Sequence, residues 1–557
     1  MEYLWKENSL EQEKIEKLYQ ELKIHPKLCR LLVARHIENY EQAKHFFRPR
    51  LEDLHSPFLM KNMDKAIKRI EEAIFKKERI LFFGDYDVDG TTSVSLMVLF
   101  FQEFYPNIDF YVPDRNGEGY GISFKGIDYA AENKIPLIVA LDCGIKAIDK
   151  VAYAKEKNID FIICDHHTPG EALPEALAIL NPKQKDCPYP YKELAGCGIG
   201  FKLCQGLAIK QGLDLEKLFA FLDLVCISIA CDIVPISGEN RILAYYGLQA
   251  LNSKPSIGVK NIVAHLDLGK DFTIADVVFK IGPRINAAGR MAHANAAVEV
   301  LINRGEVATL QSKNLERQSL DKEITQSALQ EIEKLGENSL VSTVVFDPTW
   351  HKGVVGIVAS RLIESHYKPT VVLTESEGKL TGSARSVEGF NVYEALDACS
   401  DLMLNFGGHA YAAGLTIAKE NLDEFKKRFD KEVAKRILPE QLIPKIKIDA
   451  ELLLSDIRPA FFKILQQFAP FGPENMLPIF KTCNLKDTGY SKIVGENHLK
   501  LDLQDENGNR IKGIAFKMAD KLTLLKQGSF DICYQIEENS WNGQVNLELN
   551  VKDIKAR

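Results

Sequence analysis

Short apolar runs alternate with helical stretches between about residue 66 and residue 230. Four of these runs, at residues 80–83, 110–112, 137–141 and 161–164, are each followed at once by a polar motif. They are too short for helices and too apolar for strands that have one face in water. We therefore predict a parallel sheet buried on both faces, with crossover helices between its strands, which is an α/β fold.

The pattern continues beyond this sheet. Residues 222–230 form another apolar run, which we interpret as a strand that leads to Asp232. Residues 306–337 have a charged helical pattern, which predicts one long helix between two domains. The apolar runs at 343–346 and 370–373 predict the start of a second α/β unit.

The last part of the chain has a third pattern. Residues 498–503 and 544–550 alternate between apolar and polar positions, and the sequence ENG at 506–508 supplies a turn. This pattern predicts a small antiparallel barrel. The expected divisions are an N-terminal helical segment (1–60), a first α/β domain (61–305), the connecting helix (306–337), a second α/β domain (338–438) and the barrel (439–557).

Composition places the chain among ordinary globular proteins. It has 557 residues, of which 46% are hydrophobic and 26% are charged, so several domains are expected. The net charge is −7. A protein that is held on nucleic acid by its overall charge would be basic, so any nucleic-acid site must be a local patch.

The cysteines indicate a reducing compartment. There are eleven of them, scattered and never in C-x-x-C spacing, so neither a disulfide framework nor a cysteine-type zinc site is expected. The first residues lack the basic end and apolar run of a signal peptide, and no apolar run is long enough to span a bilayer. We expect a soluble cytoplasmic protein without a membrane partner.

Residue types that bind metals follow several predicted strands. They are Asp85, Asp87, Asp89, Asp142, Asp165, His166, His167 and Asp232. The carboxyl ends of parallel strands meet at one edge of a sheet, so these groups should gather there. Crowded carboxylates repel each other unless cations lie between them. The sequence therefore predicts a metal centre.

Two simpler interpretations compete with this one. The segment 85–90 (DYDVDG) also resembles the start of a calcium-binding loop, but Leu96 stands where that loop needs a glutamate. Asp142 alone would equally suit the cap of a following helix. Carboxylates favour Mg²⁺, and added imidazole shifts the preference toward Mn²⁺. Two such ions about 4 Å apart suit phosphoester hydrolysis.

At this point the motifs resemble a known family. The segments 85–90 (DYDVDG) and 165–167 (DHH) resemble the DHH phosphoesterase superfamily, and 407–414 (GGHAYAAG) resembles its companion DHHA1 domain. The segments IGPRINAAGR and CDIVP narrow the resemblance to the RecJ family of bacterial exonucleases. The barrel, preceded by FAPFGP, resembles the oligonucleotide-binding (OB) fold of that family. The resemblance covers nearly the whole chain.

The resemblance implies roles for particular residues. The metal ligands would be Asp87, Asp89, Asp142, His166 and Asp232. Catalytic roles would fall to His167, Asp85 and Asp165, with His167 either outside the ligand set or acting on the scissile phosphate. Nucleic-acid contacts would come from Arg115, Arg284, Arg290, Ser383, Arg385 and His409. Among these, Arg115, Ser383 and Arg385 would capture a 5′-phosphate. The aromatic residues Phe516, Tyr534 and Trp541 are candidate stacking platforms, and each is equally suited to a core.

The resemblance also implies an activity. It is the 5′→3′ hydrolysis of single-stranded DNA to mononucleotides with two Mn²⁺ or Mg²⁺ ions, in DNA repair and recombination. A monomer is expected, with a helicase and a single-strand-binding protein as partners. The alternatives are a DHH phosphodiesterase for short RNA or small nucleotides, and a non-catalytic replication scaffold. The added N-terminal segment and barrel disfavour the first, and the retained ligands disfavour the second.

Overall fold

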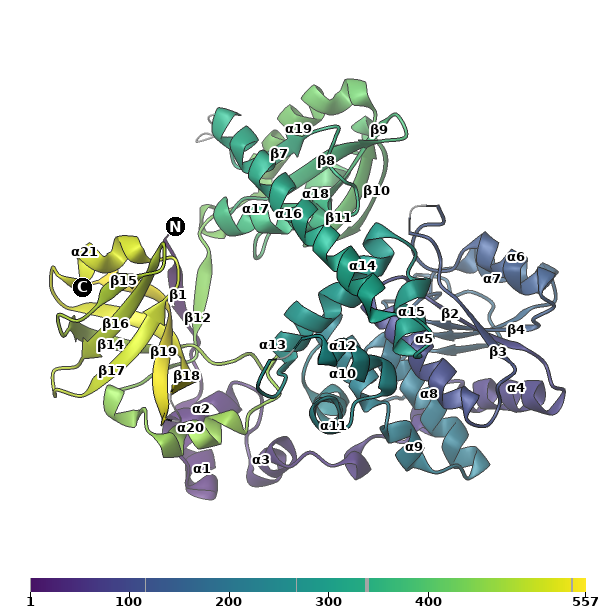
Figure 1. The fold of residues 1–557 in the computed structure, drawn as a ribbon, viewed down its shortest axis with the longest axis horizontal. Coiled ribbons are helices and arrows are strands. Elements are labelled where there is room, and N and C mark those ends of the chain that lie inside the picture. The colour runs from purple at the N-terminus through teal and green to yellow at the C-terminus, as the bar shows by residue number, and fades with distance from the viewer. Residues whose placement is uncertain (1, 116, 267, 336–339, 542–543) are drawn as a thin grey trace. The chain divides into compact units, whose positions relative to one another are not determined.

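The computed structural model describes residues 2–115, 117–266, 268–335, 340–541 and 544–557. The chain forms two compact units (Figure 1). The larger unit comprises Asn8–Gln311 and Ile448–Arg557, and the smaller unit comprises Met1–Glu7 and Ser312–Lys447. Within the described residues, no helix has both the length and the apolar character needed to cross a membrane.

The first part of the larger unit contains one sheet and the helices that pack around it. Its elements are α1 (Gln12–Leu22), α2 (Pro26–Val33), α3 (Tyr40–Phe47), α4 (Met63–Phe75), β2 (Ile80–Gly84), α5 (Val88–Gln102), β3 (Ile108–Tyr111), α6 (Phe124–Glu132), β4 (Leu137–Leu141), α7 (Ile148–Glu156), β5 (Asp160–Cys164), β6 (Ala178–Leu180), α8 (Gly196–Gln211), α9 (Leu215–Phe219), α10 (Leu222–Cys231), α11 (Gly238–Ser253), α12 (Ile257–Ala264), α13 (Ile274–Asp276), the π-helical η3 (Val277–Ile281), α14 (Gly282–Met291) and α15 (Asn295–Leu301).

The predicted parallel sheet is confirmed. Its strand order is β3-β2-β4-β5-β6, and all neighbouring strands are parallel. One face packs in a core with α4, α5, α8 and α10, and the other face packs on α6 and α7. Because β3 and β4 lie on opposite sides of β2, the sheet has a topological switch point between β2 and β4, where open α/β sheets bind ligands.

The interpretation of residues 222–230 as a strand is wrong, because they form the helix α10. Residues Leu222–Ala230 are buried on every side of this helix. A helix that is apolar all round gives no 3.6-residue period, so its sequence resembles that of a buried strand.

The C-terminal part of the larger unit is the predicted barrel. Its elements are β13 (Ala450–Glu451), α20 (Pro459–Gln466), β14 (Phe480–Asp487), β15 (Lys492–Val494), β16 (His498–Gln504), β17 (Arg510–Ala515), α21 (Leu522–Leu525), β18 (Phe530–Trp541) and β19 (Gln544–Ala556). The strand order is β13-β14-β18-β19-β17-β16-β15, and pairing of β14 with β16 closes the ring. The barrel is not wholly antiparallel, since β17 runs parallel to β19 and β13 runs parallel to β14.

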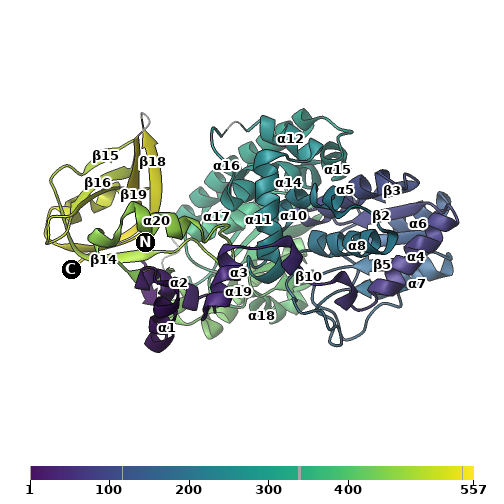
Figure 2. The same ribbon diagram turned by 90° about the horizontal axis from the view of Figure 1, so that it is seen from below.

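Helices α1 to α3 share a hydrophobic core with the barrel. Figure 2 shows α1 and α2 beside the barrel's α20 and β14. Leu28 and Leu32 of α2 belong to the same cluster as Phe461 of α20 and Phe480 of β14. The Nε of Arg30 donates to the backbone oxygen of Asp449 at 2.8 Å. The two ends of the larger unit's sequence therefore fold as one body.

Arg241 of α11 connects this body to the α/β part of the same unit. Its guanidinium is buried and donates to the backbone oxygens of Phe46, Phe468 and Ala469 at 2.9–3.1 Å. Its Cζ also lies 3.7 Å from the ring centroid of Phe46. One side chain thus holds α3 and the segment between α20 and β14 against α11.

The smaller unit contains a second sheet. Its elements are β1 (Leu4–Glu7), most of α16 (Val307–Leu335), β7 (Thr343–Phe346), α17 (Val355–Ser365), β8 (Thr370–Ser376), β9 (Lys379–Arg385), α18 (Val392–Asp397), β10 (Met403–His409), β11 (Ala412–Ile417), α19 (Leu422–Arg436) and most of β12 (Lys445–Ile448). The order is β10-β11-β9-β8-β7, with only β7 and β8 parallel. The first 60 residues are not helical throughout, because β1 pairs with β12.

Candidate metal centre

Strand register brings the first candidate residues together. Gly84 of β2 is paired with Leu141 of β4, and Leu141 is paired with Cys164 of β5. Asp85, Asp142 and Asp165 each follow one of these aligned residues. The three carboxylates therefore leave the sheet at the same edge, beside the switch point between β2 and β4.

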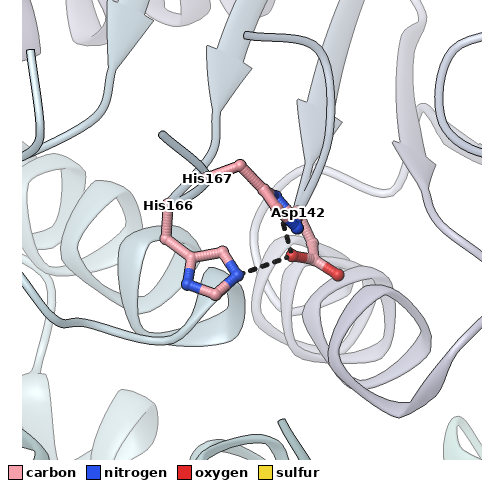
Figure 3. A group of neighbouring side chains, drawn as sticks. All are labelled: Asp142, His166 and His167. Atoms are coloured by element: carbon pink, nitrogen blue, oxygen red, sulfur yellow. Dashed lines mark ion pairs between the residues drawn. The ribbon is translucent and has the colours of Figure 1, made fainter. Parts of the chain in front are cut away.

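His166 lies among carboxylates from three other elements, and Figure 3 shows one of them, Asp142, beside His166 and His167. Its Nε2 is 3.2 Å from Asp142 Oδ1, 3.4 Å from Asp232 Oδ2 and 3.8 Å from Asp89 Oδ2. Two overlapping sets of potential metal ligands result, one with Asp142, His166 and His167, and one with Asp89, His166 and Asp232. The ligand atoms within each set lie within 4.8 Å of one another.

Several of these polar atoms are buried but lack a hydrogen bond within the described part of the chain. They include both ring nitrogens of His166, Oδ1 of Asp142 and Oδ2 of Asp85. Burial lowers the pKa of His166, so its imidazole is neutral and has a lone pair to offer. Buried polar atoms without hydrogen bonds are costly, and the donor set suits a divalent cation.

The charge of the cluster supports the same assignment. Burial and the neighbouring Asp87 raise the pKa of Asp85 to about 8. Burial and the nearby Asp89 raise the pKa of Asp232 to about 8 and that of Asp142 well above its usual range. In the protein without cations these carboxyl groups hold protons that a divalent cation would displace.

Asp89 is held by the N-terminus of α8. The backbone N–H groups of Gly196 and Cys197 donate to its two oxygens, both at 2.7 Å, and the hydroxyl of Ser228 donates to Oδ1 at 2.8 Å. Helix N-termini stabilise negative charge. A Cβ at Gly196 would lie 2.7 Å from both Cβ and Oδ1 of Asp142, so this close approach requires glycine.

Asp165 and His167 form a separate hydrogen-bonded pair. Asp165 Oδ1 accepts from His167 Nδ1 at 2.8 Å and from its backbone N–H at 3.0 Å, while Oδ2 accepts from the backbone N–H of Ile145 at 2.9 Å. Burial alone would raise the pKa of Asp165, but these hydrogen bonds hold it below its usual range. His167 Nε2 lies 3.0 Å from the hydroxyl of Tyr120. Both nitrogens of His167 are thus engaged by protein groups.

Asp87 and two of the candidate arginines border this cluster. Asp87 caps α5 by accepting from the backbone N–H of Gly90 at 3.0 Å. Arg115 lies with its Cζ 5.1 Å from the ring centroid of Tyr86. Burial raises the pKa of the Tyr86 phenol, and the positive charges of Arg115 and Arg290 partly offset this effect. Both arginines therefore lie near the loop that carries Asp85 and Asp87.

Helix α14 brings Arg290 to this position. A Cβ at Gly289 would lie 2.6 Å from the backbone oxygen of Tyr86, so the helix packs directly on the loop between the acidic residues. Arg284 lies on the same helix but has other hydrogen-bond partners. Its Nε donates to Gln311 Oε1 at 2.8 Å, and its Nη1 donates to the backbone oxygen of Lys280 at 2.5 Å.

The other nucleic-acid candidates lie in the smaller unit. Arg385 Nη1 donates to the hydroxyl of Ser383 at 2.6 Å, and both residues lie on β9. Gly356, near the start of α17, lies so close that an added Cβ would be 3.1 Å from Arg385 Nη2. His409 is exposed at the end of the edge strand β10.

The three candidate stacking residues of the barrel differ in position. Phe516 is 52% exposed. Tyr534 is fully buried and its hydroxyl lies 2.8 Å from that of Thr482, so it is a core residue and not a platform. The side chain of Trp541 lies outside what the structure describes.

Three residues of the centre are not indicated by the sequence. Tyr120, Ser228 and Gly196 contact His167, Asp89 and Asp142 respectively, but each is of a common type. No spacing marks them, since their roles depend on which elements become neighbours. The alternating glycines Gly196, Gly198 and Gly200 are a local signal of a close helix approach.

Models of three protein families match the chain. The DHH family N-terminal domain matches residues 79–229, the DHHA1 domain matches residues 336–435, and the RecJ OB domain matches residues 448–553.

Relatives of the chain match it over nearly its full length. The single-stranded-DNA-specific exonuclease RecJ of Bacillus subtilis (strain 168) is 34% identical over 99% of this chain and 70% of that relative. The enzyme of the same name from Haemophilus influenzae is 32% identical over 95% of this chain and 96% of that relative. The crystal structure of RecJ with Mn²⁺ from Thermus thermophilus matches with a TM-score of 0.86 and 25% identity, over 100% of this chain and 80% of that one.

Proposed function

The chain belongs to the RecJ family of single-stranded-DNA-specific exonucleases, and from this premise we propose that it releases mononucleotides from the 5′ end of single-stranded DNA. The reaction is metal-dependent hydrolysis of phosphodiester bonds in DNA repair and recombination. The observation that carries the proposal is the set of buried ligand atoms on His166, Asp142 and Asp85 that have no hydrogen bond among the described residues.

Two divalent cations, Mn²⁺ or Mg²⁺, fit the cluster. The proposed ligands are Asp87, Asp89, Asp142, His166 and Asp232. Four carboxylates and one neutral imidazole suit hard divalent cations, and the solved relatives include complexes with Mn²⁺ and with Mg²⁺. When bound, the cations would supply a water of lowered pKa and neutralise charge on the phosphate.

Asp165, His167 and Asp85 are not among the proposed metal ligands and have other roles. Asp165 has hydrogen bonds on both oxygens, so we assign it the positioning of His167. His167 has its Nδ1 turned to Asp165, which supports a place outside the ligand set and a role at the scissile phosphate. Asp85 accepts from the backbone N–H of Gly121 through Oδ1 and leaves Oδ2 for the cations or for a water.

The DNA contacts fall in both units. In the larger unit, Arg115 and Arg290 border the acidic cluster and suit phosphate oxygens, while Arg284 is partly engaged by Gln311. In the smaller unit, Ser383, Arg385 and His409 supply further phosphate contacts. The exposed Phe516 of the barrel supplies a stacking surface for bases. A helicase and a single-strand-binding protein remain the proposed partners in the cytoplasm.

The polarity test uses strands labelled at either end. With Mn²⁺, a 5′-labelled strand should release labelled mononucleotide first, whereas a 3′-labelled strand should shorten gradually. Without a divalent cation neither strand should change. A dinucleotide should be a poorer substrate than a long strand, which separates this activity from a phosphodiesterase for small nucleotides. Early release of the 3′ label would contradict the proposed polarity.

Arg385 provides a test of 5′-end recognition. Arg385→Ala should reduce the preference for a 5′-phosphate over a 5′-hydroxyl by roughly tenfold, because one charge-assisted phosphate contact is lost. The measurement is the rate of the first cut on the two strands. An unchanged preference would remove Arg385 from this role.

A further inference from the structure

Two tyrosines border the metal cluster without a role in the proposed chemistry. Tyr86 stands between Asp85 and Asp87, and the ring of Tyr120 lies 6.1 Å from that of Tyr86 at an interplanar angle of 85°. We call this pair the tyrosine ledge. Arg115 contacts one end of the ledge, with its Cζ 5.1 Å from the ring centroid of Tyr86. His167 contacts the other end, 3.0 Å from the hydroxyl of Tyr120.

Tyr120 is exposed but held at two points. Its relative exposure is 55%, which leaves much of the side chain open to solvent. Its hydroxyl meets His167, which is fixed by Asp165, and its ring meets the edge of Tyr86. A side chain that is already oriented loses little conformational freedom when a ligand binds. Tyr120 is therefore a prepared contact surface beside the cluster.

The order of contacts along the ledge matches one nucleotide of the substrate. The family resemblance assigns Arg115 to the 5′-phosphate, and the proposed function places the scissile phosphate at the acidic cluster. The sugar and base between these two phosphates must then lie beside the ledge. An aromatic ring offers a π-face to any of the four bases, so it would bind this nucleotide without reading its sequence.

We infer that Tyr120 is a binding residue for the 5′-terminal nucleoside, which stacks on its ring while the first phosphodiester bond is cut. This inference rests on the proposed function. Tyr86 packs against the ring and keeps it oriented, while the hydroxyl of Tyr120 contacts His167. The ledge thus recognises that a base is present, but not which base it is.

The test compares strands whose 5′-terminal nucleotide carries a base or is abasic. The wild-type protein with Mn²⁺ should cut the strand with a base more efficiently, by roughly ten- to hundredfold in kcat/KM for the first cut. Tyr120→Leu should cut both strands at the same low efficiency. Tyr120→Phe keeps the ring and should keep the preference, even if loss of the hydroxyl slows both strands equally.

The matched control is Tyr40→Leu, because Tyr40 is 53% exposed in the same unit but lies on α3. This variant should retain the wild-type preference. A Tyr120→Leu protein that still prefers the base-bearing strand would overturn the inference, as would a Tyr120→Phe protein that loses the preference. Digestion of single strands by wild-type protein without any such preference would overturn this inference alone. Absence of digestion would instead contradict the proposed function.

Discussion

His166 and Asp89 lie 3.8 Å apart, but the protein holds them by opposite means. His166 has no hydrogen bond on either ring nitrogen among the described residues. The Asp89 carboxylate accepts hydrogen bonds from Gly196, Cys197 and Ser228, and a longer one from Ser93. One side chain is therefore available mainly for a cation, whereas the other is also part of the fold.

Substitutions at these two positions should separate chemistry from stability. His166→Ala should abolish Mn²⁺-dependent hydrolysis and change the free energy of unfolding by only about 1 kcal/mol. Asp89→Ala should also abolish hydrolysis, but it should cost about 2–4 kcal/mol because buried donors lose their acceptor. Thermal melts in chelator, run beside activity assays, provide the measurement. Equal stability of the two variants would contradict this difference.

Cation binding should release protons from the cluster. The pKa values of Asp85 and Asp232 are raised to about 8, so at pH 7 both groups are mostly protonated before a cation arrives. Binding favours the ionised form, so affinity for Mn²⁺ should fall as the pH drops below 8. Asp85 and Asp232 together should release about two protons per chain at pH 7, and fewer above pH 9, in addition to the proton held by Asp142.

Calorimetry in buffers of different ionisation enthalpy measures this release. Asp232→Asn removes one of the two groups and should reduce the number of protons released. An affinity that stays constant from pH 6 to pH 9 would contradict the raised pKa values.

Except for Asp232, which follows helix α10, the acidic and histidine residues of the centre were predictable because each follows a short apolar run that forms a strand, or stands beside such a residue. Asp142 and Asp165 owe their proximity to strand register, which a parallel sheet imposes. Tyr120 was not predictable, because its contact with His167 depends on the path of a loop between β3 and α6. Loop paths have no hydrophobic period to read.

At the scale of elements, the N-terminus of α8 is the tightest part of the centre. Gly196→Ala would place a Cβ 2.7 Å from Asp142, so either the carboxylate or the helix must move. We expect a loss of about 1–3 kcal/mol in unfolding free energy and a weaker affinity for Mn²⁺.

Gly198→Ala is the matched control on the same helix. An added Cβ there would lie 3.5 Å from Leu194, which is an ordinary contact. Because alanine favours helices by up to about 1 kcal/mol over glycine, this variant should be as stable as the wild type or more so. Melting curves and Mn²⁺ titrations of both variants test the pair. Equal stability and equal Mn²⁺ affinity of the two variants would contradict the close approach of Gly196 to Asp142.

Elements differ in how well their sequences predict them. The strands β2, β4 and β5 were predictable because turn residues and charges follow their apolar runs at once. Helix α10 was not, since every face of it is buried and its pattern has no period. The parallel pairing of β17 with β19 was also hidden, because alternation shows that a strand exists but not the direction of its neighbour.

At the scale of the whole molecule, the barrel is also the support of the first helices. Leu28 and Leu32 pack in one core with Phe461 and Phe480, although no sequence pattern joins these distant segments. Contacts between residues so far apart in the chain depend on the complete fold. The first 60 residues therefore cannot be treated as a separate helical segment.

Removal of the barrel should expose this core. A chain that ends at Gln441 should bind a hydrophobic dye and lose protease resistance in α1 to α3, because their apolar partners are gone. It should keep the metal cluster, whose proposed ligands all precede Asn240. It should also bind long single strands more weakly, since stacking contributes roughly 1–3 kcal/mol per base.

Limited proteolysis and digestion of short and long strands provide the measurements. Short strands should be affected less than long ones. First helices that stay resistant to protease in the truncated chain would contradict the shared core, and unchanged affinity for long strands would contradict a role of the barrel in binding DNA.

The order of synthesis gives this shared core a temporal consequence. Helices α1 to α3 leave the ribosome first, but Phe461 and Phe480 are made roughly 430 residues later, a delay of about 20–90 s at about 5–20 residues per second. During that interval the nascent chain lacks the barrel residues that cover these helices in the finished fold. Until then the apolar faces of these helices lack their partners, so the last part of translation determines when they become buried.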